Sequence, residues 1–173
     1  MKRRYTYFTV VLGLASLLIG AFARHSPLRA ESLVFYAVTS GQQALDSGES
    51  GGNPFASALI EVLRRPTTTL SELPIELERL TAEKSQSRMA ADVPHLGAQM
   101  PWPLTPARPG ERRIALVLVV SDYSRSGGAP SLPGARHDAQ RITAALQDAG
   151  FETETALDLD AMAMRQSLDS FLA

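Results

Sequence analysis

The chain has 173 residues, a length that suits one domain or one domain and a fragment of another. With 45% hydrophobic and 20% charged residues it has the composition of a globular protein rather than a disordered one. The formal net charge of −1 gives no reason to expect nucleic-acid binding. There is no cysteine, which excludes disulfides, thiol catalysis and a lipid anchor attached through cysteine.

The N-terminus has the pattern of an export signal. A basic start at 2–4 is followed by an unbroken apolar run, "FTVVLGLASLLIGAFA", at 8–23. The run ends in Ala-Phe-Ala, the spacing of small residues that a signal peptidase accepts. The run also approaches the length that spans a bilayer, so residues 1–23 are predicted to be a cleaved signal peptide or a helical signal anchor.

Both alternatives place the rest of the chain outside the cytoplasm, because the basic flank stays inside. We therefore expect a periplasmic or secreted protein, or one anchored in the inner membrane and facing outward. Contact with the membrane is expected only through residues 5–23, and only if they are not cleaved.

The first structural unit is predicted at residues 32–104. It opens with a continuous apolar run, "LVFYAV" at 33–38, which is typical of a strand buried on both faces. A glycine-rich loop then leads to a helix with Asn53 as its N-cap and Pro54 at its first position. A second helix is expected to begin at Ser71, with its leucines on one side.

The second unit follows a linker assigned to 105–111. Four prolines between 97 and 111 argue against regular helix or central strand there. The run "RRIALVLVV" at 112–120 is the strongest strand pattern in the chain and again indicates burial on both faces. A helix at 135–149, an edge strand and a last helix capped by Asp160 are expected to complete the order.

This order of elements predicts an α/β fold, a three-layer sandwich with a mainly parallel sheet. Parallel sheets place their functional loops at the carboxyl ends of the strands. In this chain those loops are 39–52, 121–134 and the short turn near Asp158.

Two segments then carry a family resemblance. The second begins with the apolar strand, places His137-Asp138-Ala139 at a helix start and Ala149-Gly150-Phe151 before the next strand. The first contains "YAVTSGQQALD" and "NPFASAL" and, at 99–105, "QMPWPLT". Residues 112–173 resemble the start of the large subunit of the caspase and metacaspase superfamily in its bacterial branch, and residues 32–104 resemble the small subunit.

The resemblance implies a caspase-like but incomplete fold, because the small-subunit-like part comes first and the middle of the domain is missing. Family members carry a catalytic histidine in a Ser-Gly-His-Gly loop and a catalytic cysteine after the fourth strand, and this sequence has neither. His25, His95 and His137 are predicted to be surface residues. No catalytic residue, metal or cofactor is assigned, since no histidines have ligand spacing.

A substrate groove is the remaining expectation from the resemblance. In caspases the loop after the small-subunit strand shapes the pocket for the residue before the cut, and residues 43–46 fall in that loop. The acid at 46 suits a basic side chain by charge complementarity, although such residues are also common turn formers. The substrate-pocket candidates are Gln43 and Asp46 in this loop. Asp122 and Arg125, which fall in the loop 121–134, are further candidates.

The expected function is that of an exported caspase-like protein, from the cysteine endopeptidase family, which is inactive when alone. One alternative is an interaction module whose open sheet edge pairs with a peptide or protein segment, from a second copy or a strand-donating partner. Another is a truncated or rearranged fragment of an active caspase-like peptidase.

Overall fold

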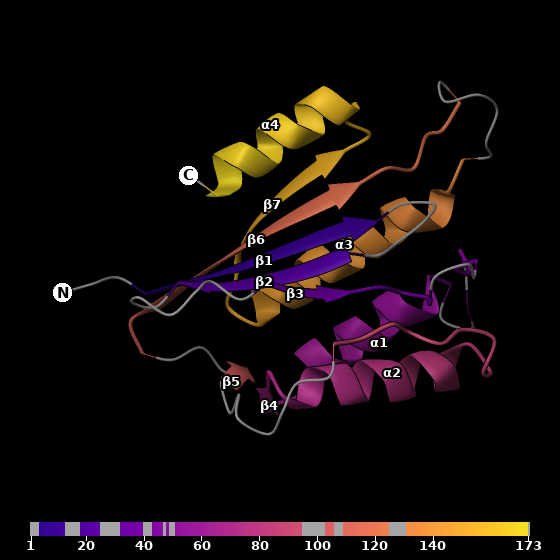
Figure 1. The fold of residues 1–173 in the computed structure, drawn as a ribbon, viewed down its shortest axis with the longest axis horizontal. Coiled ribbons are helices and arrows are strands. Elements are labelled where there is room, and N and C mark those ends of the chain that lie inside the picture. The colour runs from indigo at the N-terminus through magenta and orange to yellow at the C-terminus, as the bar shows by residue number, and fades with distance from the viewer. Residues whose placement is uncertain are drawn as a thin grey trace.

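One five-stranded sheet with helices on both faces organises the protein (Figure 1). The computed structural model describes residues 4–12, 18–24, 32–39, 43–46, 48, 51–94, 103–105, 109–124 and 131–172. The strands are β1 (Arg4–Leu12), β2 (Leu18–Arg24), β3 (Ser32–Phe35), β4 (Thr68–Thr69), β5 (Pro103–Thr105), β6 (Glu111–Val119) and β7 (Glu152–Leu157). The helices are α1 (Pro54–Leu63), α2 (Glu72–Lys84), α3 (Pro133–Asp148) and α4 (Ala161–Leu172).

The sheet has the strand order β3-β2-β1-β6-β7. β6 pairs in parallel with both β1 and β7, whereas β2 is antiparallel to both of its neighbours. All strands except β2 therefore run in one direction, so the sheet is mainly parallel, as the sequence predicts. A separate two-stranded sheet joins β4 to β5.

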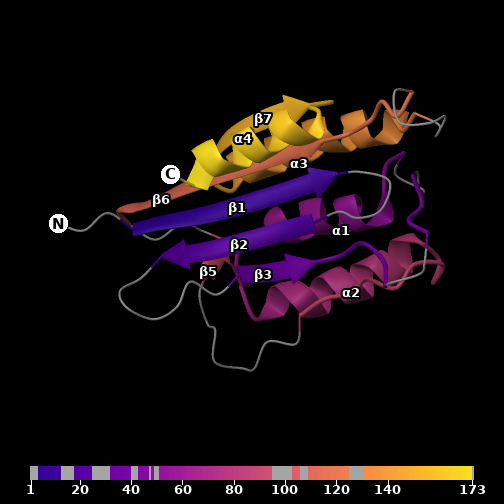
Figure 2. The same cartoon turned by 45° about the horizontal axis from the view of Figure 1, so that its top comes forward.

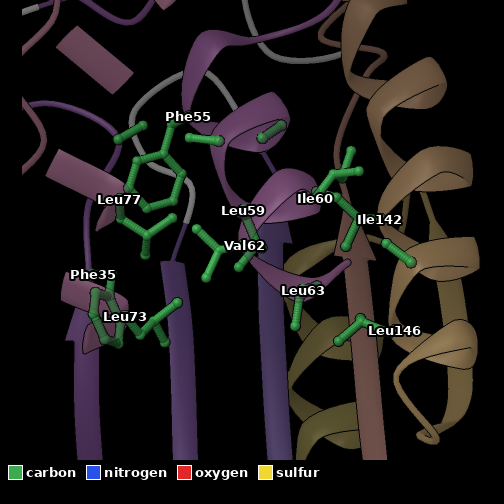
Figure 3. Packing of buried hydrophobic residues seen from close by; sticks show 14 of the residues in the cluster. Phe35, Phe55, Leu59, Ile60, Val62, Leu63, Leu73, Leu77, Ile142 and Leu146 are labelled. Atoms are coloured by element: carbon green, nitrogen blue, oxygen red, sulfur yellow. The ribbon is translucent and has the colours of Figure 1, made fainter. Parts of the chain in front are cut away.

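Helices cover the two faces of the sheet unequally. Figure 2 shows α1, α2 and α3 on one side and α4 on the other, over β6 and β7. On the larger side, α1 packs between Leu73 and Leu77 of α2 and Ile142 and Leu146 of α3 (Figure 3). Residues 115–119 of β6 are all buried, which fits its unbroken apolar run, because both faces of the strand are covered.

The two sides of β6 belong to two different clusters. Ala115, Val117 and Val119 belong to the large cluster, while Leu116 and Leu118 pack with Phe171 of α4 in a small one. The small cluster holds only three of the buried residues that the structure describes.

The N-terminus differs from the expected helix, because residues 4–12 and 18–24 form β1 and β2. The physical reason lies in the sequence "YTYFTVV" at 5–11, whose aromatic and β-branched residues favour a strand over a helix. Gly20 also lowers helix propensity. Among the described helices, none combines the length and apolar character needed to cross a bilayer.

The helix boundaries follow local sequence closely. The Asn53 side chain accepts hydrogen bonds from the backbone N–H groups of Phe55 (2.9 Å) and Ala56 (3.2 Å), so α1 begins where the N-cap predicts. The Asp160 carboxylate likewise accepts from the Ala163 N–H (2.8 Å) at the start of α4. The proline-rich stretch contains the short strand β5 at the edge of the two-stranded sheet, and an edge strand tolerates the missing donor of Pro103.

Candidate functional site

The carboxyl ends of β6 and β7 are joined by the side chain of Asp158. Its Oδ1 accepts hydrogen bonds from the backbone N–H groups of Ser121 (2.7 Å) and Asp122 (3.0 Å), and from the Ser121 hydroxyl (3.0 Å). Its other oxygen forms an ion pair with Arg136 of α3. Asp158 has a positive φ of 51°, a conformation that Asp tolerates better than most residues.

These bonds change the acidity of the group. The N–H of Ser121 above all, and then the N–H of Asp122, the Ser121 hydroxyl and Arg136, lower the pKa of Asp158 to about 2, against the opposing effect of burial. Asp158 is therefore a carboxylate throughout the ordinary pH range.

A second carboxylate joins the two halves of the chain. Asp138 of α3 is 1% exposed, and its Oδ2 accepts from the backbone N–H of Asn53 (2.8 Å). Arg141 donates from the same nitrogen to Asp138 Oδ1 and to the Ser57 hydroxyl, both at 3.3 Å. Gly52 lies so close to Asp138 and Arg141 that a Cβ would clash with both.

Burial is the largest influence on Asp138 and raises its pKa, while the bond from Asn53 and the charge of Arg141 act in the opposite direction.

The first half of α3 carries two residues that bond to other elements. Arg136 connects the helix to the ends of β6 and β7, and Asp138 connects it to the start of α1.

The predicted pocket residues lie around these anchors. Asp46 is exposed, and its backbone oxygen lies 2.6 Å from where a Cβ on Gly134 would stand, at the start of α3. Gln43 is exposed in the same loop. Asp122 is exposed as well, and its Oδ1 accepts from the Ser124 N–H (2.9 Å), which makes it a turn former. Arg125 lies outside the described residues.

The structure places Asp46 against the start of α3 and Asp122 beside Asp158. A role for any of the four candidates in holding a substrate stays a prediction. His137 is exposed on α3, while His25 and His95 fall outside the part of the chain that the structure describes.

Ser121 carries a hydroxyl at the carboxyl end of β6, but its surroundings do not suit a nucleophile. It is 4% exposed, donates to Asp158 and accepts from Arg136 Nε (2.7 Å). A carboxylate with so low a pKa is a weak general base, and a guanidinium does not accept a proton. The arrangement therefore suits structural anchoring rather than acyl transfer.

Sequence reasoning did not single out Ser121, Arg136 or Asp158 as interacting residues. A usable pattern exists for Asp138, which occupies the apolar face of α3 with Ala135 and Ile142 at helical spacing. A carboxylate at such a position must find buried partners.

Metal binding has no support among the described residues, which contain no cluster of three or more His, Cys, Asp or Glu side chains suited to an ion.

The structure is an α/β sandwich in which hydrogen bonds of Asp138 and Asp158 join the described loops at one end of the sheet. The family model of the caspase domain, Peptidase_C14, matches residues 112–173, about a third of the chain. This C-terminal segment is therefore caspase-like, and the mainly parallel sheet with its helices fits an incomplete caspase-like fold. No curated protein and no solved structure matches the chain significantly.

Proposed function

We propose that this caspase-like protein is exported and has no peptidase activity of its own. The observation that supports the proposal is the absence of cysteine from all 173 residues. The chemistry of cysteine endopeptidases needs a thiolate as nucleophile and an imidazole to manage the proton. The anchoring bonds of Ser121 and Asp158 add support, because they engage the polar groups at the edge of the sheet where catalysis would be expected.

Peptidase activity is tested with fluorogenic peptides that end in Arg, Lys or Asp before the reporter group. We expect no release of the reporter by the full chain above the buffer background, with or without iodoacetamide. Ser121→Ala and His137→Ala are the matched variants. Release that is resistant to iodoacetamide and lost in either variant would contradict the proposal and identify a different nucleophile or base.

Export is tested separately by fusing residues 1–31 to a reporter enzyme that is active only outside the cytoplasm. We expect activity from the fusion, because a basic start and an apolar run direct translocation. Leu17→Arg places a charge in the run and is expected to abolish the activity. Equal activity from both fusions would argue against an export signal.

A second candidate function is recognition of a basic peptide by the free edge of β7. Among the strands that the structure describes, β7 pairs only with β6. Glu152 and Glu154 lie on the same face of this strand, and both are exposed. Strand addition there favours a partner whose alternate side chains are Lys or Arg, because opposite charges on neighbouring strands attract.

Fluorescence anisotropy of a labelled peptide of alternating Lys and Thr tests this recognition. We expect binding to the full chain that weakens at higher salt and is lost in Glu154→Lys. A peptide of alternating Glu and Thr is the control. Equal binding of both peptides, or binding unchanged in Glu154→Lys, would eliminate this candidate.

A further inference from the structure

The two sheet positions between β3 and β6 are filled by a single hairpin. β1 lies beside β6 along its whole length, from Arg4 opposite Glu111 to Leu12 opposite Val119. β2 returns antiparallel beside β1 and carries β3 on its other edge. Within the described sheet, β3 is therefore joined to β6 and β7 only through β1 and β2.

The same residues carry the export pattern. Their backbone cannot pair as strands in the sheet and form a membrane helix at the same time. In a bilayer the N–H and C=O groups of a single segment must bond within that segment, which requires a helix. In the sheet, the groups of β1 bond to β2 and β6 instead. Engagement of residues 8–23 by a membrane therefore requires that the hairpin leave the sheet.

Departure of the hairpin would leave a defined slot. β6 would lose its parallel neighbour along an apolar strand whose side chains are buried on both faces, Val117 at 0% and Leu118 at 2% exposure. An edge of this kind strongly favours strand addition. Its length and register match the β1 sequence of this chain, and the apolar surroundings favour the apolar hairpin as the occupant.

We propose that β1 and β2 form a detachable β-hairpin that occupies a strand-acceptor slot between β3 and β6 and leaves it when a membrane binds this part of the chain. The occupant of the slot is the hairpin of the same chain. This inference deepens the proposed export function and rests on it for the membrane-bound state, but occupancy of the slot is independent of export.

Occupancy is tested by disulfide cross-linking, for which a chain without cysteine gives a clean background. Val10 and Val117 are register partners, and neighbouring strands lie within the range of Cα separations that a disulfide spans. The matched control pairs Val10 with Val119, which is two residues out of register. All the changes are Val→Cys, so the loss of volume is the same.

With the full chain under mild oxidation, we expect an intramolecular disulfide in V10C/V117C and at least about tenfold less in V10C/V119C. Equal cross-linking in the two variants, or none in either, would overturn the proposal. A covalent dimer from V10C/V117C would also overturn it, and would assign the slot to the hairpin of a second copy.

Hydrogen exchange on the unchanged protein covers the case in which the cysteine variants do not fold. We expect the amides of β1 and β6 to be protected to a similar degree, because they bond to each other. Exchange of β1 at unstructured rates beside a protected β6 would contradict occupancy.

Competition with a membrane is tested by flotation of V10C/V117C with vesicles of phosphatidylethanolamine and phosphatidylglycerol. We expect the reduced protein to float with the vesicles and the oxidised protein to float at least about tenfold less, with recovery after a reductant is added, because a hairpin locked in the sheet does not form the helix a bilayer requires. Equal flotation of both forms would overturn the competition. If the reporter fusion shows no activity while the cross-linking and flotation results are as expected, the export function is wrong and the detachable hairpin is still supported.

Discussion

The pKa values of Asp138 and Asp158 are shifted in opposite directions in the folded protein. Asp158 receives hydrogen bonds at the exposed end of the sheet, which favour its charged form. Asp138 is enclosed between α1 and α3, where burial favours its neutral form. Because a pKa that differs between folded and unfolded chains makes stability depend on pH, the two residues act in opposite directions as the pH changes.

Asp158→Asn is predicted to destabilise the protein at pH 7 by about 1–2 kcal/mol, less than the full pKa shift implies because the carboxylate is partly exposed to solvent. Asn keeps the tolerance for a positive φ but loses the charge. The pKa of Asp158 is lower in the folded chain, so its contribution is present above the ordinary value near 3.8 and is lost as the pH falls towards about 2.

Urea denaturation at pH 7 and at pH 2 measures this effect. The difference between the wild type and Asp158→Asn should shrink at the lower pH. A difference that is equal at both pH values would show that shape rather than charge connects β7 to Ser121.

Asp138→Asn is predicted to make stability less dependent on pH in the region above pH 4. The folded chain holds the proton of Asp138 more tightly, so its contribution is fully present below the unfolded pKa and is lost as the pH rises through the folded pKa. Asn keeps an acceptor for the Asn53 N–H without the cost of burying a charge. Asp138→Ala is the contrasting variant and should cost about 1–3 kcal/mol, because that N–H loses its partner.

Denaturation midpoints of both variants between pH 4 and pH 8 provide the measurement. An Asp138→Asn protein whose midpoint varies with pH as strongly as that of the wild type would contradict the assignment of the raised pKa to Asp138.

At the scale of elements, the junction between the loop before α1 and the helix α3 depends on the missing side chain of Gly52. A Cβ at this position would clash with the Asp138 carboxylate and with the Arg141 guanidinium. Gly51 next to it has open space but a φ of +76°, so a side chain there meets strain without a clash. Substitutions at Gly52 and Gly51 therefore distinguish the effect of a steric clash from the effect of backbone strain.

Gly52→Ala is predicted to lower the free energy of unfolding by more than Gly51→Ala, whose cost should be about 1–2 kcal/mol from backbone strain. Thermal denaturation of the two variants compares them. If Gly51→Ala is the more harmful change, the junction is held by the conformation of the loop and not by the contact with Asp138.

The elements also show what sequence can and cannot predict. The caps at Asn53 and Asp160 act within a few residues, so the starts of α1 and α4 follow from local sequence. β1 and β2 were expected to form a helix, because an apolar run without polar residues on one face does not distinguish a membrane helix from a central strand. The aromatic and β-branched residues at 5–11 favour a strand, and pairing with β6 stabilises it. The bonds of Asp158 to Ser121 join residues far apart in the sequence, and no local pattern signals them.

For the molecule as a whole, the unequal covering of the sheet predicts unequal stability. The cluster beneath α1, α2 and α3 contains most of the described core, whereas α4 rests on Leu116, Leu118 and a few partly buried residues. Opening of α4 therefore exposes little apolar surface and should occur more readily than unfolding of the whole chain.

Leu59→Ala in α1 is predicted to destabilise the whole protein by about 2–5 kcal/mol, because Leu59 is fully buried and its removal leaves a cavity. Phe171→Ala should mainly speed amide exchange in α4 and change the global midpoint less. Hydrogen exchange with mass spectrometry, combined with urea denaturation, distinguishes local from global effects. Equal loss of protection in α1 and α4 for both variants would show that the two sides of the sheet unfold together.

The strand order could be predicted only in part. The mainly parallel character follows from the apolar runs of β3 and β6, each separated from the next strand by helices. The insertion of the N-terminal hairpin between them does not, since it brings together segments about a hundred residues apart in the sequence.

The edge strand β7 has a consequence for how copies of this protein behave when concentrated. Glu152 and Glu154 lie on one face of this strand, and Glu152 forms an ion pair with Arg112 (2.6 Å). A second copy approaching this edge brings the carboxylate of Glu154 towards its own counterpart, and like charges facing each other across strands repel. Fibrous stacking of the chain through β7 is therefore opposed at neutral pH. Glu154→Gln removes one of these charges, so concentrated solutions of this variant should become turbid at a lower protein concentration than the wild type.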